Sequence, residues 1–298
     1  MLAIHCAICG KKEKLQDLYK ENFDVKKINF ATFSARRTPD RIHYRFVKCL
    51  RCGLIFSNPI LEEKKITALY LKSDFHYSQE SEYVGKTYTF YLEKLLPKTG
   101  RSKLKLLDVG CGNGFFLEKA QEIGIKHVYG IEPGKASVKK APKDLQKRIK
   151  IDILRKGLFK INSFDIICCF HTLDHVTDPN EFLKITRSLL KKGGTCFFIV
   201  HNTDGLSVKL FGEKSPIFDI EHVYLFNPKT LVKIFKKNKF RKIQVIDIKN
   251  RYPLKYWFRM TPFPKKIKES ILKLLKLTKT DSLPLSLSAG NIGIVAYK

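Results

Sequence analysis

A glycine-rich loop between two apolar segments is the feature that most constrains how this chain can fold. Residues 103–132 read KLKLLDVGCGNGFFLEKAQEIGIKHVYGIE. The pattern predicts a buried strand, a G-x-G-x-G loop over residues 110–114, a helix over about 115–122 that stops near Gly124, and a second strand that ends in Glu132. This order of strand, helix and strand is typical of an α/β domain with a parallel sheet.

The residues around the loop favour a nucleoside ligand that carries an ammonium group. Glycines let the backbone approach a ligand closely, and the free N–H groups at the start of the following helix attract a carboxylate. Asp108, just before the loop, suits an ammonium group, and Glu132, 24 residues later, suits the hydroxyls of a ribose. A dinucleotide site would instead read G-x-G-x-x-G, with room for a pyrophosphate.

These residues resemble the S-adenosylmethionine (SAM) site of class I methyltransferases. The segment 160–200, KINSFDIICCFHTLDHVTDPNEFLKITRSLLKKGGTCFFIV, is similar to a later part of that family, with Asp174 where glutamate is more common. The resemblance covers about residues 100–298 and implies a Rossmann-like α/β sheet that is parallel except for one antiparallel strand. It implies SAM as the cofactor, with these residues binding it: Asp108, Gly110, Gly112, Asn113, Gly114, Glu132, Asp152 and Phe170.

The resemblance also implies separate roles within this set. The three loop glycines would hold the methionine part of SAM, Asp108 would face its amino end, and Glu132 would face the ribose. Asp152 falls where the family often holds the adenine amine; the alternative is an ordinary acidic loop residue. The helix after the fourth strand is expected to be capped by Asp178, to start at Pro179 and to end at Gly193.

Two matching cysteine pairs lie near the N-terminus. CAICG holds Cys6 and Cys9, and CLRCG holds Cys49 and Cys52. Two C-x2-C pairs, each followed by glycine, supply four thiolates, which suits a structural tetrahedral zinc ion. Disulfides are the alternative, which a cytosolic location disfavours. Short β-like runs at 28–33 and 43–48, around a turn at Pro39-Asp40, favour a zinc ribbon over residues 1–58.

The predicted organisation has three parts: the zinc ribbon over 1–58, a helical linker or cap over 59–100, and a SAM-binding methyltransferase domain over 101–298 with an insertion at about 250–287. The ribbon followed by this domain resembles a subgroup that includes sugar C-methyltransferases. Some ribosomal RNA methyltransferases also carry a zinc knuckle, so the ribbon alone leaves RNA open as a substrate.

The segment FDIEHVYLFNP, residues 218–228, is the predicted acceptor side of the site. Methyl transfer to a hydroxyl or a carbon acid requires loss of a proton, and histidine is the usual base near neutral pH. Glu221 and His222 match a Tyr-x-Glu-His pattern of the sugar subgroup, although Asp219 stands in place of the tyrosine. We expect His222 to be the base and Glu221 to orient it. A packing role for His222 is the alternative.

Two other histidines on the loop after the fourth strand, His171 and His175, are rival bases. The dipeptide Asn227-Pro228 predicts a helix start, which fixes where the acceptor segment ends.

Near the C-terminus, about forty residues separate the last two predicted strands. Within them, Ile267, Ile271, Leu274 and Leu275 share one helical face while lysines occupy much of the rest. This pattern predicts a peripheral membrane contact through residues 253–280. A helix that covers the core or forms a dimer is the alternative.

Charge and composition widen the choice of acceptor. The net charge is +29, but only 12 of the 57 basic residues are arginine, the residue that phosphate and base recognition prefers. We therefore expect a small-molecule acceptor, such as a sugar nucleotide or a glycan or lipid-linked precursor. RNA is the alternative substrate, and a SAM-binding or zinc-ribbon adaptor is the non-enzymatic alternative. No apolar run approaches a membrane span and the N-terminus lacks a signal peptide, so we expect a cytoplasmic protein, with membrane association as an extension.

Overall fold

The structure is a computed structural model that describes residues 1–24, 28, 33, 41–72 and 80–298. The predicted turn at Pro39-Asp40 and most of the predicted strand at 28–33 lie outside these ranges. The predicted helices in the linker are present on both sides of the gap at 73–79, as α1 and α2. The bounds of these two helices are Glu63–Lys72 and Glu80–Glu93.

A seven-stranded sheet forms the centre of the described structure, in the order β10-β13-β8-β7-β4-β5-β6. Neighbouring strands are parallel except at β13, which is antiparallel to both β8 and β10. This confirms the predicted Rossmann-like sheet with one antiparallel strand. The strands are β4 (Lys105–Val109), β5 (His127–Ile131), β6 (Ile149–Lys150), β7 (Phe164–Phe170), β8 (Leu190–His201), β10 (Arg241–Asp247) and β13 (Asn291–Tyr297).

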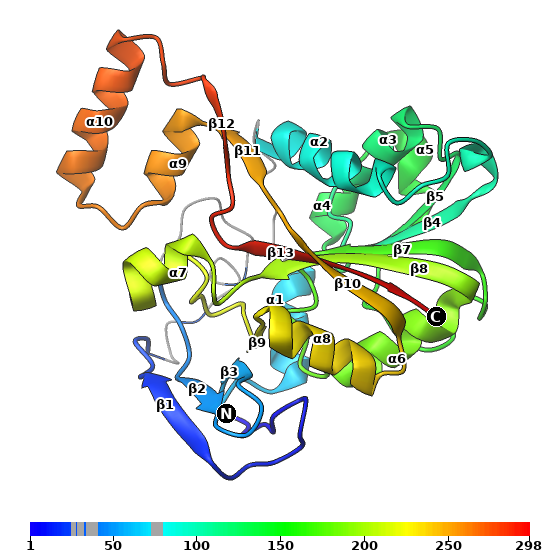
Figure 1. The fold of residues 1–298 in the computed structure, drawn as a ribbon, viewed down its shortest axis with the longest axis horizontal. Helices are drawn as coiled ribbons and strands as arrows, with labels where there is room; N and C mark the ends of the chain where they lie inside the picture. Colours follow the sequence, from blue (N-terminus) through cyan, green and yellow to red (C-terminus); the bar gives the residue numbers. More distant parts are fainter. Residues whose placement is uncertain (25–27, 29–32, 34–40, 73–79) are drawn as a thin grey trace.

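Helices cover both faces of this sheet (Figure 1). The alternating apolar residues of β4, β7 and β8 pack on one face against α2, α3, α4 and α5, and on the other against α6, α8 and the N-terminal segment. Period-two alternation places successive side chains on opposite faces, so one strand contributes to both hydrophobic clusters. The remaining helices of the main domain are α3 (Phe115–Glu122), α4 (Lys135–Lys139), α5 (Lys143–Gln146), α6 (Pro179–Leu189), α7 (Leu206–Phe211) and α8 (Pro228–Lys237), with short 3-10 turns at Arg101–Lys103 and Gly212–Lys214.

The helix starts predicted from capping residues are confirmed. The Asp178 carboxylate accepts from the first backbone N–H groups of α6, and Asn227 forms a capping box with Thr230 at the start of α8. The predicted end of α6 at Gly193 is wrong, because the helix ends at Leu189. Leu190 is extended, fully buried and paired with Phe164 in the sheet. Its burial and strand pairing stabilise the chain more than one further turn of helix would.

The N-terminal segment builds a second, four-stranded sheet in the order β1-β2-β3-β9. Its first three strands are β1 (Leu15–Tyr19), β2 (Phe46–Cys49) and β3 (Ile55–Ser57). The fourth, β9 (Tyr224–Leu225), comes from the segment that holds Glu221 and His222. The N-terminal sheet is therefore joined to the main domain by backbone pairing.

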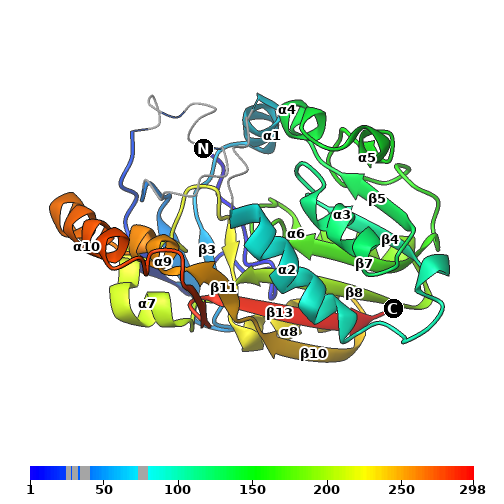
Figure 2. The same cartoon turned by 90° about the horizontal axis from the view of Figure 1, so that it is seen from above.

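A hairpin-like excursion separates β10 from β13. It contains β11 (Asn250–Pro253), α9 (Leu254–Met260), α10 (Lys265–Leu277) and β12 (Pro284–Leu287), and β11 pairs with β12. Figures 1 and 2 both place α9 and α10 at the end of the molecule opposite β5 and α5. No residue of α10 is buried. Among the residues that the structure describes, no helix has the length and apolar character needed to cross a membrane.

Candidate functional site

One large cavity of about 780 Å³ lies at the carboxyl ends of β4, β5, β7 and β8. Ligands of open α/β sheets bind at this edge. Five of the eight residues predicted to bind SAM line this cavity, namely Asp108, Gly110, Glu132, Asp152 and Phe170, whereas Gly112, Asn113 and Gly114 do not. His175, His201 and His222 line the same cavity. The cofactor and acceptor residues predicted from separate stretches of sequence therefore face the same space.

The glycine loop at the cofactor end is held in one shape by Glu132. One carboxylate oxygen of Glu132 accepts from the backbone N–H of Gly112 at 2.9 Å, and the other accepts from Gly134 at 2.8 Å. Gly110 has a φ of +81°, and a Cβ added there would lie 2.1 Å from Thr172 Oγ1. The tight loop therefore requires glycine at position 110, for both its backbone conformation and its space.

Asp108 lies at the end of β4 and is only 2% exposed. Its Oδ1 atom has no hydrogen-bond partner among the residues that the structure describes. Burial, followed by the nearby Glu132 carboxylate, raises the pKa of Asp108 well above its usual range. A cationic ligand group beside this carboxyl would reverse both effects, so the site fits the ammonium group of SAM.

The remaining residues predicted to bind SAM lie around the same loop. Asn113 Oδ1 accepts from the backbone N–H of Phe115 at 3.2 Å and so supports the start of α3. Phe170 lines the cavity and stacks on Tyr88 of α2, with ring centroids 4.2 Å apart. Asp152 also lines the cavity, and its carboxylate accepts from Arg155 Nε at 2.9 Å. Asp152 therefore faces the cavity while it forms an ion pair with Arg155, and its role toward SAM stays a prediction.

His222 is buried at the acceptor end of the cavity, with 6% of its surface exposed. Its Nδ1 atom lies 2.6 Å from the carbonyl oxygen of Ile217, a backbone partner that the sequence did not predict. Burial, together with the neighbouring histidines, lowers the pKa of His222 well below its usual range, so the ring is neutral at pH 7. Glu221, its predicted orienting residue, is also buried and lines the cavity.

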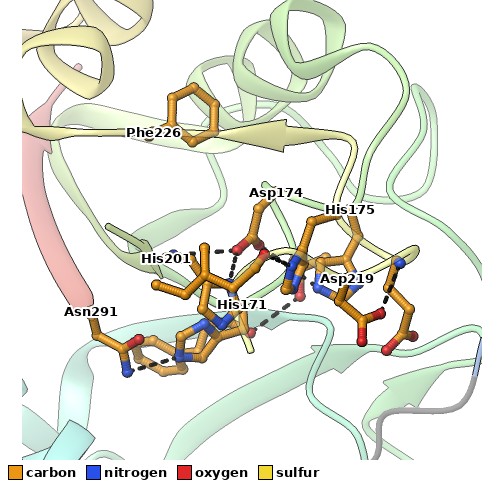
Figure 3. Close-up of polar contacts among 12 residues, drawn as sticks. His171, Asp174, His175, His201, Asp219, Phe226 and Asn291 are labelled. Carbon is orange, nitrogen blue, oxygen red and sulfur yellow. Dashed lines mark hydrogen bonds and ion pairs between the residues drawn. The ribbon is translucent and has the colours of Figure 1, made fainter. Parts of the chain in front are cut away.

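Asp174 is fully buried next to the cavity-lining His175 and His201, with histidine side chains on both sides of it (Figure 3). Its Oδ2 atom lies 2.5 Å from His201 Nδ1, and its Oδ1 atom lies 3.9 Å from His175 Nε2. Burial alone would raise the pKa of this fully buried carboxyl, but His201, His175 and His222 hold it well below its usual range. Asp174 is therefore an anion at neutral pH, and its Oδ2 atom accepts from His201 Nδ1.

The four histidines of this region form a connected group around Asp174. The ring centroids are 4.3 Å apart for His201 and His222, 4.5 Å for His171 and His201, and 5.0 Å for His175 and His222. The sequence indicated His171, His175 and His222 but missed a role for His201. Its position directly at the end of β8, beside the end of β7, was the available signal.

The pair formed by Asp174 and His201 has the arrangement of a general base. The Asp174 carboxylate fixes the tautomer of His201 through Nδ1, which leaves Nε2 able to accept a proton. His201 lines the same cavity as Asp108 and Glu132. The arrangement can therefore take a proton from a ligand bound next to the cofactor.

The N-terminal segment forms one wall of the acceptor end. Ser57 donates from Oγ to the carbonyl of His222 at 2.8 Å, and its N–H donates to the carbonyl of Val223 at 2.9 Å. The Tyr70 hydroxyl of α1 lies 3.0 Å from His175 Nδ1. These contacts show that residues before the glycine loop position both histidines.

The four N-terminal cysteines converge as predicted, with their Sγ atoms within 4.8 Å of one another. The closest pairs are Cys6 with Cys52 at 3.3 Å and Cys9 with Cys49 at 3.5 Å. These distances exceed the roughly 2.05 Å of a disulfide and are close to the roughly 3.8 Å between thiolates that share a tetrahedral zinc ion with 2.3 Å bonds. The residues present therefore fit a zinc ion.

The comparisons with known proteins agree on the kind of domain. A family model described as a methyltransferase domain matches residues 81–245. A SAM-dependent methyltransferase from Archaeoglobus fulgidus superposes with a TM-score of 0.50 at 17% identity, over 73% of this chain and 94% of that one. At this identity the superposition supports the fold alone.

Two groups of curated relatives match part of the chain. A ubiquinone biosynthesis O-methyltransferase of Colwellia psychrerythraea is 28% identical over 127 residues, which is 41% of this chain and 51% of the relative. A tRNA U34 carboxymethyltransferase of Campylobacter hominis is 26% identical over 157 residues, which is 49% of this chain and 53% of the relative. The chain spans about half the length of the curated relatives it matches.

Proposed function

The chain belongs to the methyltransferase-domain family, and we propose that it transfers the methyl group of SAM to an oxygen atom of a small, largely apolar acceptor. One observation carries this proposal. A single cavity joins the glycine loop, where SAM would lie, to the Asp174–His201 pair, which can take a proton. A binding module would need no such base next to its ligand.

The cofactor end supplies the SAM-binding groups. Asp108 would hold the amino group, Glu132 would face the ribose while it fixes the loop, and Phe170 and Asp152 would line the rest of the cofactor space. SAM supplies an electrophilic methyl group. The chain's own contribution is to place a deprotonated oxygen in line with that methyl and to exclude water from it.

The acceptor end supplies the base. His201, held by Asp174, would accept the proton of the acceptor hydroxyl at Nε2. His222 is less suited to this role than the sequence suggested, because burial and its histidine neighbours make it a weaker base. His222 and Glu221 line the acceptor space and would position the acceptor.

The walls of the acceptor end favour an apolar ligand. Residues Tyr252, Tyr256 and Trp257 of the excursion line the cavity, and aromatic walls suit a ring or a lipid chain. The ubiquinone biosynthesis O-methyltransferases among the relatives also favour an oxygen acceptor on a small molecule. No relative named above supports the sugar nucleotide predicted from the sequence, so a lipid-linked acceptor is the part of that prediction we retain.

The same excursion would bring the protein to a membrane that holds such an acceptor. Helix α9 lines the cavity, whereas α10 exposes Leu274 and Leu277 at 59% and 72% beside five lysines. An exposed apolar row flanked by lysines suits an interface with anionic lipid. A lipid-linked acceptor could then enter the cavity past α9.

The four N-terminal cysteines would hold a structural zinc ion. Cys49 ends β2, β2 pairs with β3, and β3 pairs with β9 next to His222. A zinc ion at the cysteines would therefore stabilise the strands that position His222. Four thiolates leave no open coordination position for catalysis.

A labelling experiment tests the proposed reaction. Purified protein is incubated with SAM carrying a labelled methyl group and, in separate reactions, with a membrane lipid extract, hydroxylated aromatic compounds, sugar nucleotides or total RNA. We expect label in the lipid or aromatic fraction, and its loss in His201→Ala. Label in RNA or in sugar nucleotides would contradict the proposed acceptor, and no label in any fraction would favour a SAM-binding module.

A further inference from the structure

Asp174, His175 and His222 form a second group of metal-ligating side chains, distinct from the four cysteines. We propose that this group binds a divalent transition-metal ion through Asp174 Oδ1 and the Nε2 atoms of the two histidines. One ligating atom from each of the three side chains lies within 4.8 Å of the others. The Asp174 Oδ1 to His175 Nε2 distance is 3.9 Å. Two ligands on one tetrahedral ion with bonds of about 2.1 Å lie about 3.4 Å apart, so a small movement of either side chain would bring both atoms onto one ion.

The other nitrogen of each imidazole is already engaged. His222 Nδ1 lies 2.6 Å from the carbonyl of Ile217, and His175 Nδ1 lies 3.0 Å from the hydroxyl of Tyr70. Histidines that bind metals almost always use their second ring nitrogen in this way, because it fixes the tautomer and the direction of the lone pair. A carbonyl accepts from Nδ1–H, so the Nε2 atom of His222 carries a lone pair.

The carboxylate contributes an atom that lacks any other partner. Asp174 has no exposed surface, and its Oδ1 atom makes no hydrogen bond to any residue that the structure describes. A buried carboxylate oxygen without a donor is costly, and a cation is the partner that would satisfy it. The second oxygen is occupied, because Oδ2 lies 2.5 Å from His201 Nδ1.

A neighbouring group, His171 with Asp174 and His201, is a less suitable site. The 2.5 Å between Asp174 Oδ2 and His201 Nδ1 is a direct hydrogen bond. Two ligands on one ion with bonds of about 2.1 Å lie about 3 Å or more apart, so no ion fits between these two atoms. Asp174 can therefore bind a metal through Oδ1 while it holds His201 through Oδ2.

The ligand set indicates the kind of metal. Two imidazoles and one carboxylate favour a transition-metal ion such as zinc or iron over magnesium or calcium, which prefer oxygen ligands throughout. Three protein ligands leave open positions, and His175 and His222 line the cavity near His201, while Asp174 is fully buried beside them. A metal ion held in this way could also bind an oxygen atom of a ligand, whereas four thiolates at the cysteine site leave no open position.

The metal would deepen the proposed function, and its role in transfer rests on that function. A cation beside the acceptor hydroxyl lowers its pKa. The hydroxyl proton would pass to His201, the oxygen would form a bond to the methyl carbon, and the bond between that carbon and the SAM sulfur would break. The products are the methylated acceptor and S-adenosylhomocysteine, with the proton released from His201 to solvent.

Metal binding can be measured without an acceptor, so its failure is distinguishable from failure of the proposed reaction. The purified 298-residue chain, with its cysteine site loaded with zinc, is titrated with Mn²⁺, which thiolates bind poorly. Free Mn²⁺ is followed by electron paramagnetic resonance. We expect one Mn²⁺ per chain, and affinity at least about tenfold lower in His175→Ala and in His222→Gln. The control variant His127→Ala changes an exposed histidine on β5 and should bind as the unmodified protein does.

A conservative variant separates the metal role from simple damage to the fold. Tyr70→Phe removes the partner of His175 Nδ1 but leaves all three ligands, and should weaken Mn²⁺ by about 10-fold. SAM binding of each variant, measured by calorimetry, reports whether the fold is intact. Retention of full Mn²⁺ affinity in either histidine variant, or the absence of Mn²⁺ binding to the unmodified chain, would overturn the assignment.

Discussion

Replacing Gly110 by alanine tests how the glycine loop is built, because the chain contains a matched control. Gly110 and Gly157 both have a φ of +81°. A Cβ added at Gly110 would lie 2.1 Å from Thr172 Oγ1, whereas a Cβ added at Gly157 would meet nothing within 4 Å. The two substitutions share the cost of the left-handed backbone and differ in the clash.

The expected losses of stability follow from these two terms. Alanine in the left-handed region costs about 1–2 kcal/mol, which is the whole expected loss for Gly157→Ala. Overpacking adds about 1–3 kcal/mol, so Gly110→Ala should lose about 2–5 kcal/mol. Thr172→Ala in the Gly110→Ala background removes the clashing hydroxyl and should restore most of the second term.

Urea denaturation of the four proteins measures the free energies of unfolding, and calorimetry measures SAM binding. We expect Gly110→Ala to weaken SAM binding as well, because Gly110 lines the cavity, while Gly157→Ala leaves it unchanged. Equal stability losses at the two positions would refute the reasoning, since the clash would then contribute nothing. Failure of the Thr172→Ala background to recover stability would refute the assignment of the clash to that side chain.

Three further predictions concern charge and exposed surface. Asp108→Asn should weaken SAM binding by about 10–100-fold, because a charge-assisted hydrogen bond is lost, whereas Asp144→Asn, on an exposed acid, should not. Burial and neighbouring histidines lower the pKa of His222 below 6.5, so unfolding takes up protons and stability falls as the pH falls below 6.5. Urea denaturation at pH 7 and 5.5 should therefore show about 1 kcal/mol more loss for the unmodified protein than for His222→Gln, and equal losses would contradict it. Leu274→Glu should reduce co-sedimentation with anionic vesicles while Ile161→Glu, at a similar exposure elsewhere, should not; equal pelleting of both would exclude α10 as the membrane contact.

The cofactor half of the site could be predicted from sequence because it is built from contiguous residues. The strand at 105–109, the glycine loop and the strand at 127–131 follow one another within a single β-α-β unit, and their spacing fixes their geometry. The helix predicted over 115–122 has those bounds in the structure. Only the hydrogen bonds of Glu132 to the loop were beyond prediction, because they depend on how close the loop returns to β5.

The acceptor half could be predicted only in part, because its residues come from four separate segments. Tyr70, the Asp174-His175 pair, His201 and His222 have no common spacing, so no local pattern reveals that they meet. The pairing of β3 with β9 decides where His222 lies, and a two-residue strand leaves no period-two signal in the sequence. The sequence therefore indicated His222 by its neighbours, whereas the histidine that Asp174 contacts through Nδ1 is His201.

The N-terminal segment was predicted as a module of its own, but its contacts with the histidines could not be predicted from its sequence. Its cysteine pairs predicted a metal-binding module, and such a module is compatible with an appendage that recognises RNA. In the structure, Ser57 donates to the backbone carbonyls of His222 and Val223, and Tyr70 of α1 contacts His175. The segment thus contributes to the acceptor wall, so its substitution should alter acceptor binding as well as stability. The contacts with His222 and His175 give the cysteine module a structural role that requires no nucleic-acid partner, even though the chain carries a net charge of +29.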